Sequence, residues 1–347
     1  LRLIALCTFL AALIGLFVAD RGLERLAYYQ GSFSDPNEYS IFLLYGLPSI
    51  VFSSVMAKNF AVKLLFLSTT VLVLWAILRT GSRGALVALA VLLLSYFIYS
   101  SPLKKMLLVM VCAIGMMVAL VVLPQNLILR YSSIFSSTKN LNAEDLGKLG
   151  EALGSSESRL SLLLTSIETT VKHPLFGVGP DTFGGYYSDL VKRESGSNTA
   201  SLTTHNTYTQ ISSEMGIPNL LVFISILVSS YRRLSWILSA GRAHLEGISE
   251  QTVQCAFFLR LMLIGVAAGA FFLSLGYSSL FFTLTATIMA CDLVASDEMK
   301  RYRLLKQATQ AETPLRTSSP LPSPVVAAPL PVPTRNGVRL GRSREAL

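Results

Sequence analysis

Apolar positions in this chain are gathered into long runs and do not alternate with polar positions. Eight runs are long enough to cross the roughly 30 Å hydrocarbon core of a membrane as helices. They cover residues 3–19, 40–57, 61–78, 84–100, 105–123, 217–234, 257–275 and 277–295. Because a spanning segment must satisfy its own backbone hydrogen bonds, each run is expected to be helical. The pattern predicts an all-α polytopic integral membrane protein.

The overall composition agrees with this prediction. Of the 347 residues, 52% are hydrophobic and 14% are charged, whereas soluble domains carry about 25% charged residues. The chain opens at Leu1 inside an apolar run. We therefore expect a truncated bundle, in which residues 1–123 hold five spans and further spans precede them. A signal peptide is the alternative, but the run lacks a basic leader of normal length and a clear small-residue cleavage site.

Two further segments complete the expected layout around the last three spans, which occupy residues 217–295. Residues 124–216 form a loop of roughly 90 residues, and loops of that length are usually functional. Residues 296–347 form a basic tail that is rich in Pro, Ser and Ala. This composition predicts a disordered cytoplasmic tail, with recruitment of a partner as the alternative.

Lys and Arg residues set the expected orientation, because they collect on the cytoplasmic side of membrane proteins. The tail is rich in them, and the connector 235–256 follows Arg232 and Arg233 and contains Arg242, which places both segments inside. Alternation of the spans then places residues 20–39, 79–84 and 124–216 outside. In a bacterial inner membrane, this outer side is the periplasm.

The formal net charge of +9 therefore lies mostly inside, where it favours contact with anionic membrane lipids. The outer loop is not basic, since it holds seven Lys or Arg residues against nine Asp or Glu residues. No basic stripe is interleaved with aromatic residues, so nucleic-acid binding is not expected. Cys7, Cys112 and Cys291 lie in predicted spans, Cys255 lies two residues before one, and no Asp-x-Asp pattern occurs outside. Neither a metal site nor another cofactor is therefore expected.

The turn at 79–84 carries two arginines, Arg79 and Arg83, between the third and fourth spans. Basic residues on the outer side run against the usual charge bias, and binding of an anionic ligand is a reason for them. Anchoring at the lipid headgroups is the alternative, and it applies to Arg79 more than to Arg83.

Two helices are predicted within the long outer loop. The first covers residues 155–172, with Ser155 or Ser156 as its cap, Arg159 in its first turn and apolar residues along one face. The second covers residues 204–215, with Thr203 or Thr204 as its cap. His205 then lies in the first turn, where the helix dipole disfavours the imidazolium and keeps the ring able to accept a proton.

Four segments together resemble the O-antigen ligase and polymerase family of bacterial envelope proteins. The resemblance extends to their order around the large loop, and it covers roughly residues 20–235. The segments are Gly31-Ser-Phe-Ser-Asp-Pro-Asn37, Thr80-Gly-Ser-Arg-Gly-Ala85, His173-Pro-Leu-Phe-Gly-Val-Gly-Pro180 and His205-Asn-Thr-Tyr-Thr-Gln-Ile-Ser-Ser-Glu-Met-Gly-Ile-Pro218. Asn219 departs from the glycine that relatives more often carry after this proline.

The resemblance implies a membrane glycosyltransferase with a GT-C-like helical bundle. Members of the family carry a glycan from a polyprenyl-pyrophosphate donor to an acceptor hydroxyl at the outer membrane face. Their two functional arginines and one histidine match Arg83, Arg159 and His205. By the same resemblance, further contacts to substrate are expected from polar residues of the matching motifs and the turn between the third and fourth spans. These are Arg79, Asp35, Asn37, Asn206 and Tyr208.

Each of these further residues also has a simpler interpretation. Asp35 and Asn37 form a local turn ahead of the second span, and Tyr208 suits an aromatic belt at the membrane interface. The chemistry of the transfer gives the arginines and the histidine their expected roles. A guanidinium grips phosphate oxygens with two parallel hydrogen bonds, and a neutral histidine can accept the acceptor's proton. Direct displacement would invert the anomeric centre without a metal.

The acceptor stays open between the lipid A core, another repeat unit and a protein side chain. A transporter or flippase for a lipid-linked anionic substrate is the competing class. It predicts charges near the bilayer midplane and internal repeats, whereas the predicted spans carry almost no charge and show no convincing repeat. A scaffold for envelope assembly is a third reading, which leaves Arg83 unexplained.

Overall fold

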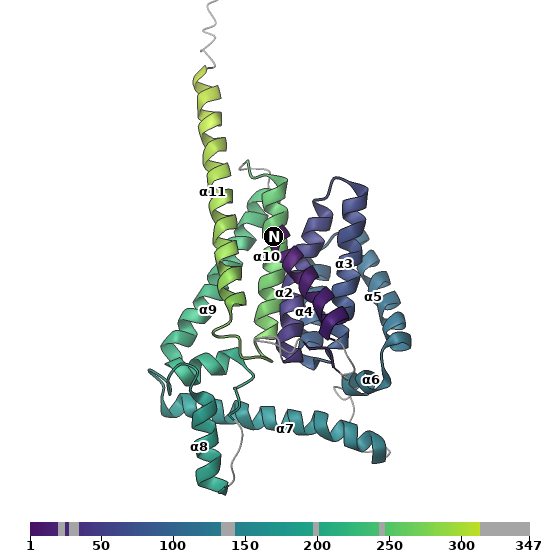
Figure 1. The fold of residues 1–347 in the computed structure, drawn as a ribbon. Coiled ribbons are helices and arrows are strands. Elements are labelled where there is room, and N and C mark those ends of the chain that lie inside the picture. Colours follow the sequence, from purple (N-terminus) through teal and green to yellow (C-terminus); the bar gives the residue numbers. More distant parts are fainter. Residues whose placement is uncertain (20–24, 28–34, 133–142, 197–200, 243–246, 313–347) are drawn as a thin grey trace, which may run out of the picture. The chain divides into compact units, whose positions relative to one another are not determined.

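The computed structural model describes residues 1–19, 25–27, 35–132, 143–196, 201–242 and 247–312. All regular structure in these residues is helical (Figure 1), which confirms the prediction of an all-α polytopic membrane protein. The elements are α1 (Arg2–Ile14), η1 (Gly15–Ala19), α2 (Pro36–Val55), α3 (Phe60–Arg79), α4 (Arg83–Tyr99), α5 (Pro102–Val122), α6 (Gln125–Ser132), α7 (Ala143–Lys172), α8 (Phe183–Ser195), α9 (Thr207–Arg242), α10 (Glu250–Gly269) and α11 (Ser279–Glu312).

The chain divides into two compact units, Leu1–Leu304 and Leu305–Leu347, and the first contains every residue of the candidate site described below. Within the described residues, α2, α3, α5, α9, α10 and α11 are long and apolar enough to cross a membrane. The spans expected over 3–19 and 84–100 fall on shorter apolar helices.

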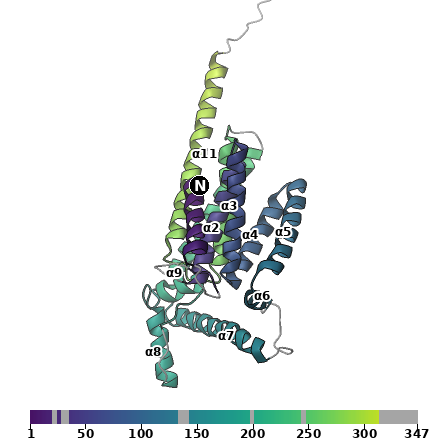
Figure 2. The same cartoon turned by 45° about the vertical axis from the view of Figure 1, so that its right-hand side comes forward.

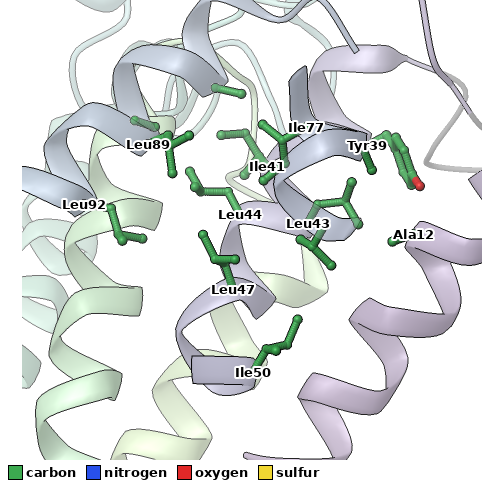
Figure 3. Packing of buried hydrophobic residues seen from close by; sticks show 14 of the residues in the cluster. Ala12, Tyr39, Ile41, Leu43, Leu44, Leu47, Ile50, Ile77, Leu89 and Leu92 are labelled. Carbon is green, nitrogen blue, oxygen red and sulfur yellow. The ribbon is translucent and has the colours of Figure 1, made fainter. Parts of the chain in front are cut away.

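Helix α2 packs against four other helices, α1, α3, α4 and α10. Figure 3 shows its side chains between those of α1, α3 and α4, with Leu43 and Leu44 fully buried. Gly46 permits the contact with α1, because a Cβ there would lie only 1.7 Å from the Thr8 hydroxyl oxygen. A second apolar cluster joins α9, α10 and α11 through residues that include Leu234, Leu259 and Leu284.

Helices α6, α7 and α8 lie beyond one end of these packed helices, and α7 runs across that end in both views (Figures 1 and 2). Helix α7 begins at Ala143, so the predicted cap at Ser155 or Ser156 was wrong. Its contact with α9 uses a buried face that includes Ser166 and Thr169. These hydroxyls are accommodated because each donates a hydrogen bond to a carbonyl of its own helix.

Helix α9 leads from the outer loop into a candidate membrane span through a kink. The helix predicted over 204–215 begins at Thr207, and it continues to Arg242 across a kink at Gly216. Gly216 has φ +84°. A Cβ added at Gly216 would lie only 2.2 Å from the Leu175 carbonyl oxygen. The kink therefore depends on glycine both for its backbone conformation and for space.

The C-terminal boundary also differs from the prediction. Helix α11 continues to Glu312, so the disorder expected from residue 296 was wrong for residues 296–312. The remainder of the predicted tail, 313–347, lies outside the described residues.

Candidate active site

The turn between α3 and α4 is held by two arginines from distant parts of the chain. The Thr80 carbonyl accepts a 2.9 Å hydrogen bond from Arg25 Nε, and the Gly81 carbonyl accepts a 2.9 Å bond from Arg130 Nε. Gly81 has φ +63°, which a residue with a side chain rarely adopts. Because both carbonyls accept these bonds, the two arginines hold the backbone of the turn that leads into α4.

Arg83 is the first residue of α4, and the sequence around it explains its placement. Ser82 precedes it, and the Ser82 hydroxyl accepts a 3.3 Å hydrogen bond from the Ala85 N–H as the helix cap. Gly84 follows and faces Phe272, with only 2.6 Å between the Phe272 Cβ and a Cβ added at Gly84. The motif therefore starts a helix, places an arginine at its first position and admits a neighbouring segment.

Asp35 and Asn37 stand at the start of α2 and connect to the same turn. The Asp35 carboxylate accepts hydrogen bonds of 2.8 and 2.9 Å from the backbone and side-chain N–H groups of Asn37. The Asn37 amide oxygen then accepts a 3.2 Å bond from Arg25 Nη2. Through Arg25, both residues are linked to Thr80. The remainder of their motif, residues 31–34, lies outside the described residues.

His205 lies two residues before the start of α9, and its backbone is in the left-handed region with φ +50°. The prediction that it lies in the first helical turn was wrong. Asn206 is the capping residue, because its side-chain oxygen accepts bonds from the N–H groups of Tyr208 and Thr209. Asn206, and not the predicted Thr203 or Thr204, therefore satisfies the first backbone N–H groups of α9.

The backbone around His205 is fastened to the segment that follows α10. The Thr207 N–H donates to the Ala270 carbonyl at 2.8 Å. The Thr207 hydroxyl donates to the Leu273 carbonyl at 2.7 Å and accepts from the Leu275 N–H at 2.9 Å. On the other side of His205, the Thr204 and Ser274 hydroxyls lie 3.1 Å apart. Left-handed backbone persists where surrounding bonds enforce it, and here residues 270–275 supply them.

Electrostatic interactions connect His205 with Arg159 of α7. Burial is the main cause that lowers the pKa of His205, the positive charge of Arg159 lowers it further, and Asp35 acts in the opposite direction. The pKa of Arg159 is itself lowered by burial and by Arg130, against the influence of Asp35. The neutral form of His205 is therefore favoured, as the sequence predicted. The dominant causes are burial and Arg159, and the predicted place in the first helical turn was wrong.

The remaining arginines extend the same cluster. Arg83 lies within electrostatic range of Arg130 and Arg159. The pKa of Arg25 falls to about 10, through burial first and then the repulsion of Arg130, with Asp35 opposing and Arg159 adding to it. We call these six residues the arginine cluster. They are Arg25, Asp35, Arg83, Arg130, Arg159 and His205.

Arg25 and Arg130 were missed from the sequence, although a signal for them existed. Both lie in segments that the charge bias placed outside, 20–39 and 124–216, so the reasoning applied to Arg83 extends to them. Neither follows a residue pattern that indicates a hydrogen bond to the turn. Only the fold brings them to Thr80 and Gly81.

Three other predicted contacts have defined places in the fold. Arg79 ends α3, and its carbonyl accepts a bond from the Leu26 N–H. The Asn206 side-chain amide donates to the Phe271 carbonyl. The Tyr208 hydroxyl donates to the Ala267 carbonyl, and its ring packs 4.5 Å from that of Phe271. A contact of these residues with substrate stays a prediction.

Comparison with known proteins gives one family. Residues 68–224 match the family model described as O-antigen ligase, and no curated protein matches the chain. The matched segment contains Arg83, Arg130, Arg159 and His205, whereas Arg25 and Asp35 precede it. The match confirms the resemblance that the four motifs indicated. Residues 68–224, and with them four of the six residues of the arginine cluster, are therefore similar to the O-antigen ligase family.

Proposed function

We propose that this protein transfers a glycan from a polyprenyl-pyrophosphate donor to an acceptor hydroxyl at the periplasmic face of the bacterial inner membrane. The observation that carries the proposal is the arginine cluster. Arg25 and Arg130 bond to the turn that leads to Arg83, and Arg159 and His205 lie within electrostatic range of this group. The family match supports glycan transfer of the ligase or polymerase type. The apolar helices support a multi-pass membrane protein, and the family match supports a lipid-linked glycan donor.

In this proposal, Arg83 and Arg159 bind the pyrophosphate of the donor. Their guanidiniums remain charged and present two parallel N–H groups to phosphate oxygens. They come from α4 and α7 and lie within electrostatic range of each other. Charge on the pyrophosphate grows as its bond to the sugar breaks, so fixed positive groups stabilise the transition state more than the bound donor.

His205 serves as the general base. The acceptor oxygen attacks the anomeric carbon while the bond from that carbon to the pyrophosphate oxygen breaks. The hydroxyl proton passes to the neutral imidazole, and polyprenyl pyrophosphate leaves with the bonding electrons. A single displacement of this kind inverts the anomeric centre. Arg159 and burial keep the imidazole neutral, which is the form a base requires.

The arginines also support metal independence, because they supply the positive charge that a divalent cation provides in other pyrophosphate chemistry. The acceptor is either the lipid A core, a repeat unit of the glycan or a protein side chain. Transport of a lipid-linked anion is the alternative, which predicts charge inside the spans. Arg260 of α10 is such a charge, but its guanidinium stacks 3.9 Å from the Tyr99 ring centroid, at the opposite end of α4 from Arg83.

The test uses the full-length protein in liposomes with a polyprenyl-pyrophosphate-linked glycan. The His205→Ala variant is expected to insert normally and to lose release of free polyprenyl pyrophosphate. His173→Ala is the matched control, because His173 is exposed and meets the Tyr186 ring. A ladder of glycan products indicates a polymerase, and a single acceptor adduct indicates a ligase. Release at the wild-type rate from His205→Ala would refute the base assignment.

A further inference from the structure

Arg25 and Arg130 approach one glycine together. A Cβ added at Gly81 would lie 3.3 Å from Arg130 Cδ and 3.4 Å from Arg25 Nε. Their Nε groups bond to consecutive carbonyls, those of Thr80 and Gly81. Arg25 precedes α2 and Arg130 lies in α6, so helices α2 to α5 separate them in the sequence. The fold brings both side chains to the turn that leads to Arg83.

Holding two carbonyls does not require two charges. A neutral amide donates the same hydrogen bond, whereas gathering guanidiniums costs free energy through their mutual repulsion. That repulsion is felt in the cluster, since Arg130 and Arg159 both destabilise the charged form of Arg25. Asp35 is the carboxylate that opposes it. The arrangement is therefore suited to an incoming anion of high charge.

A guanidinium carries five N–H donors, and the bond to the turn uses one of them, Nε, in both Arg25 and Arg130. Resting on the proposed function, we propose that Arg25 and Arg130 bind the pyrophosphate together with Arg83 and Arg159, and that the four prefer a terminal pyrophosphate to a pyrophosphate diester. The donor carries its pyrophosphate as a diester with two ionised oxygens. When the bond to the sugar breaks, the leaving group gains a further ionised oxygen.

This preference has a catalytic consequence. A site that binds the more highly charged form better stabilises charge that develops only as the bond breaks. Arg25 and Arg130 therefore contribute to the rate of bond cleavage and not only to retention of the donor. The same preference makes the released lipid pyrophosphate, and inorganic pyrophosphate as its soluble mimic, inhibitors of the enzyme.

The first measurement needs no variant. Inorganic pyrophosphate and dimethyl pyrophosphate, a symmetrical diester, are titrated into the detergent-solubilised full-length protein by calorimetry. We expect at least about tenfold tighter binding of inorganic pyrophosphate, the ratio for one added charge-assisted hydrogen bond. Equal affinities for the two probes would overturn the proposed preference.

The second measurement assigns the preference to the two residues. Arg25→Gln and Arg130→Gln keep a donor for the turn and remove the charge, and each is expected to lower the affinity for inorganic pyrophosphate at least about tenfold. Arg130→Lys, which keeps the charge, is expected to recover part of the loss. Arg193→Gln is the control, because Arg193 is exposed in the last turn of α8. Wild-type affinity in both glutamine variants would refute the proposal.

These outcomes separate the inference from the proposed function, because binding of inorganic pyrophosphate requires no glycan transfer. Transfer that depends on His205, combined with pyrophosphate binding that ignores Arg25 and Arg130, would leave the function standing and reject the inference. Pyrophosphate binding that depends on both arginines, in a protein that transfers no glycan, would support their anion site and reject the function.

Discussion

Gly84 and Phe272 approach each other so closely that a Cβ added at Gly84 would lie 2.6 Å from the Phe272 Cβ. Gly84 follows Arg83 in the first turn of α4. Phe272 belongs to the segment 270–275, which holds the backbone on both sides of His205. This single contact therefore sets the spacing between the proposed pyrophosphate-binding arginine and the proposed base.

Substitution of Gly84 by alanine should separate these two groups. The added methyl group meets Phe272, and either the first turn of α4 or the segment 270–275 must shift. A displacement of about 1 Å in a reacting group lowers rates by up to roughly a hundredfold. Glycan transfer by Gly84→Ala in liposomes is expected to fall at least about tenfold. Gly115→Ala is the control, since no atom lies within 4 Å of a Cβ built there, and equal activity of the two variants would contradict the prediction.

The pH dependence of transfer should reflect the lowered pKa of His205. The base must be neutral, and its folded-state pKa lies below the ordinary value of 6.5. The rate should therefore stay constant as pH falls through 6.5 and decline only at lower pH. Measuring kcat/KM from about pH 4.5 to about pH 8, on both sides of the ordinary histidine pKa, gives the profile. A decline centred above 6.5 would show that His205 is not the titrating base.

Two neighbours of His205 should shift that profile in opposite directions. Arg159 lowers the pKa of His205, so Arg159→Gln should move the acidic limb of the residual activity to higher pH. Asp35 raises this pKa, so Asp35→Asn should move the limb to lower pH. Shifts of the same sign in both variants would be incompatible with the electrostatic link described for the cluster.

Thr207→Val should destabilise the support of His205 without changing the size of the side chain. The Thr207 hydroxyl donates to the Leu273 carbonyl and accepts from the Leu275 N–H, and removing it leaves two buried backbone groups without this partner. We expect a loss of about 1–3 kcal/mol in the free energy of unfolding, together with reduced transfer. Thermal unfolding in detergent measures the first effect. Thr283→Val is the matched control, because the exposed Thr283 hydroxyl bonds only within α11, and its unfolding should resemble wild type.

Replacement of Arg83 by lysine tests whether geometry or charge alone is required. Lysine keeps the positive charge but cannot present two parallel donors to a phosphate. Transfer by Arg83→Lys should be much weaker than wild type, and Arg159→Lys should behave in the same way. Arg193→Lys, a substitution on the exposed end of α8, should transfer normally. Full activity in Arg83→Lys would reduce Arg83 to an anchor at the headgroups.

Chelation should leave transfer unchanged. If the arginine cluster supplies the charge that stabilises the leaving pyrophosphate, EDTA has no essential ion to remove. The assay is repeated with EDTA, and then with added Mg²⁺, using the same liposomes. Strong inhibition that Mg²⁺ reverses would overturn metal independence.

Sequence patterns predicted the helical architecture well, because a spanning helix depends on the mean polarity of about 20 residues and tolerates exchanges within them. Helix ends were less predictable. His205 was placed in a helical turn because Thr203 and Thr204 are good caps, yet Asn206 caps α9. The left-handed backbone at His205 depends on bonds to residues 270–275, which no local pattern reveals.

The outer loop shows the same limit on a larger scale. Apolar residues in the C-terminal part of α7 recur with helical spacing, and this spacing predicted the helix over 155–172. Leu160, Leu164 and Val171 are exposed, while the contact with α9 buries Ser166 and Thr169. Serine and threonine can be buried there because they bond to carbonyls of their own helix. The roles of Arg25 and Arg130 could not be predicted for a related reason. Both bond to backbone carbonyls, and every residue carries one.

Arg83 is the first residue of an apolar helix, and under the proposed function its guanidinium lies at the boundary between hydrocarbon and water. A lipid-linked substrate bound there under the proposed function keeps its tail in the bilayer and need not be extracted. When the acceptor is also a lipid, donor and acceptor meet by lateral diffusion within one leaflet. Encounter then depends on the number of molecules per unit area of membrane, and dilution of the cell suspension leaves it unchanged.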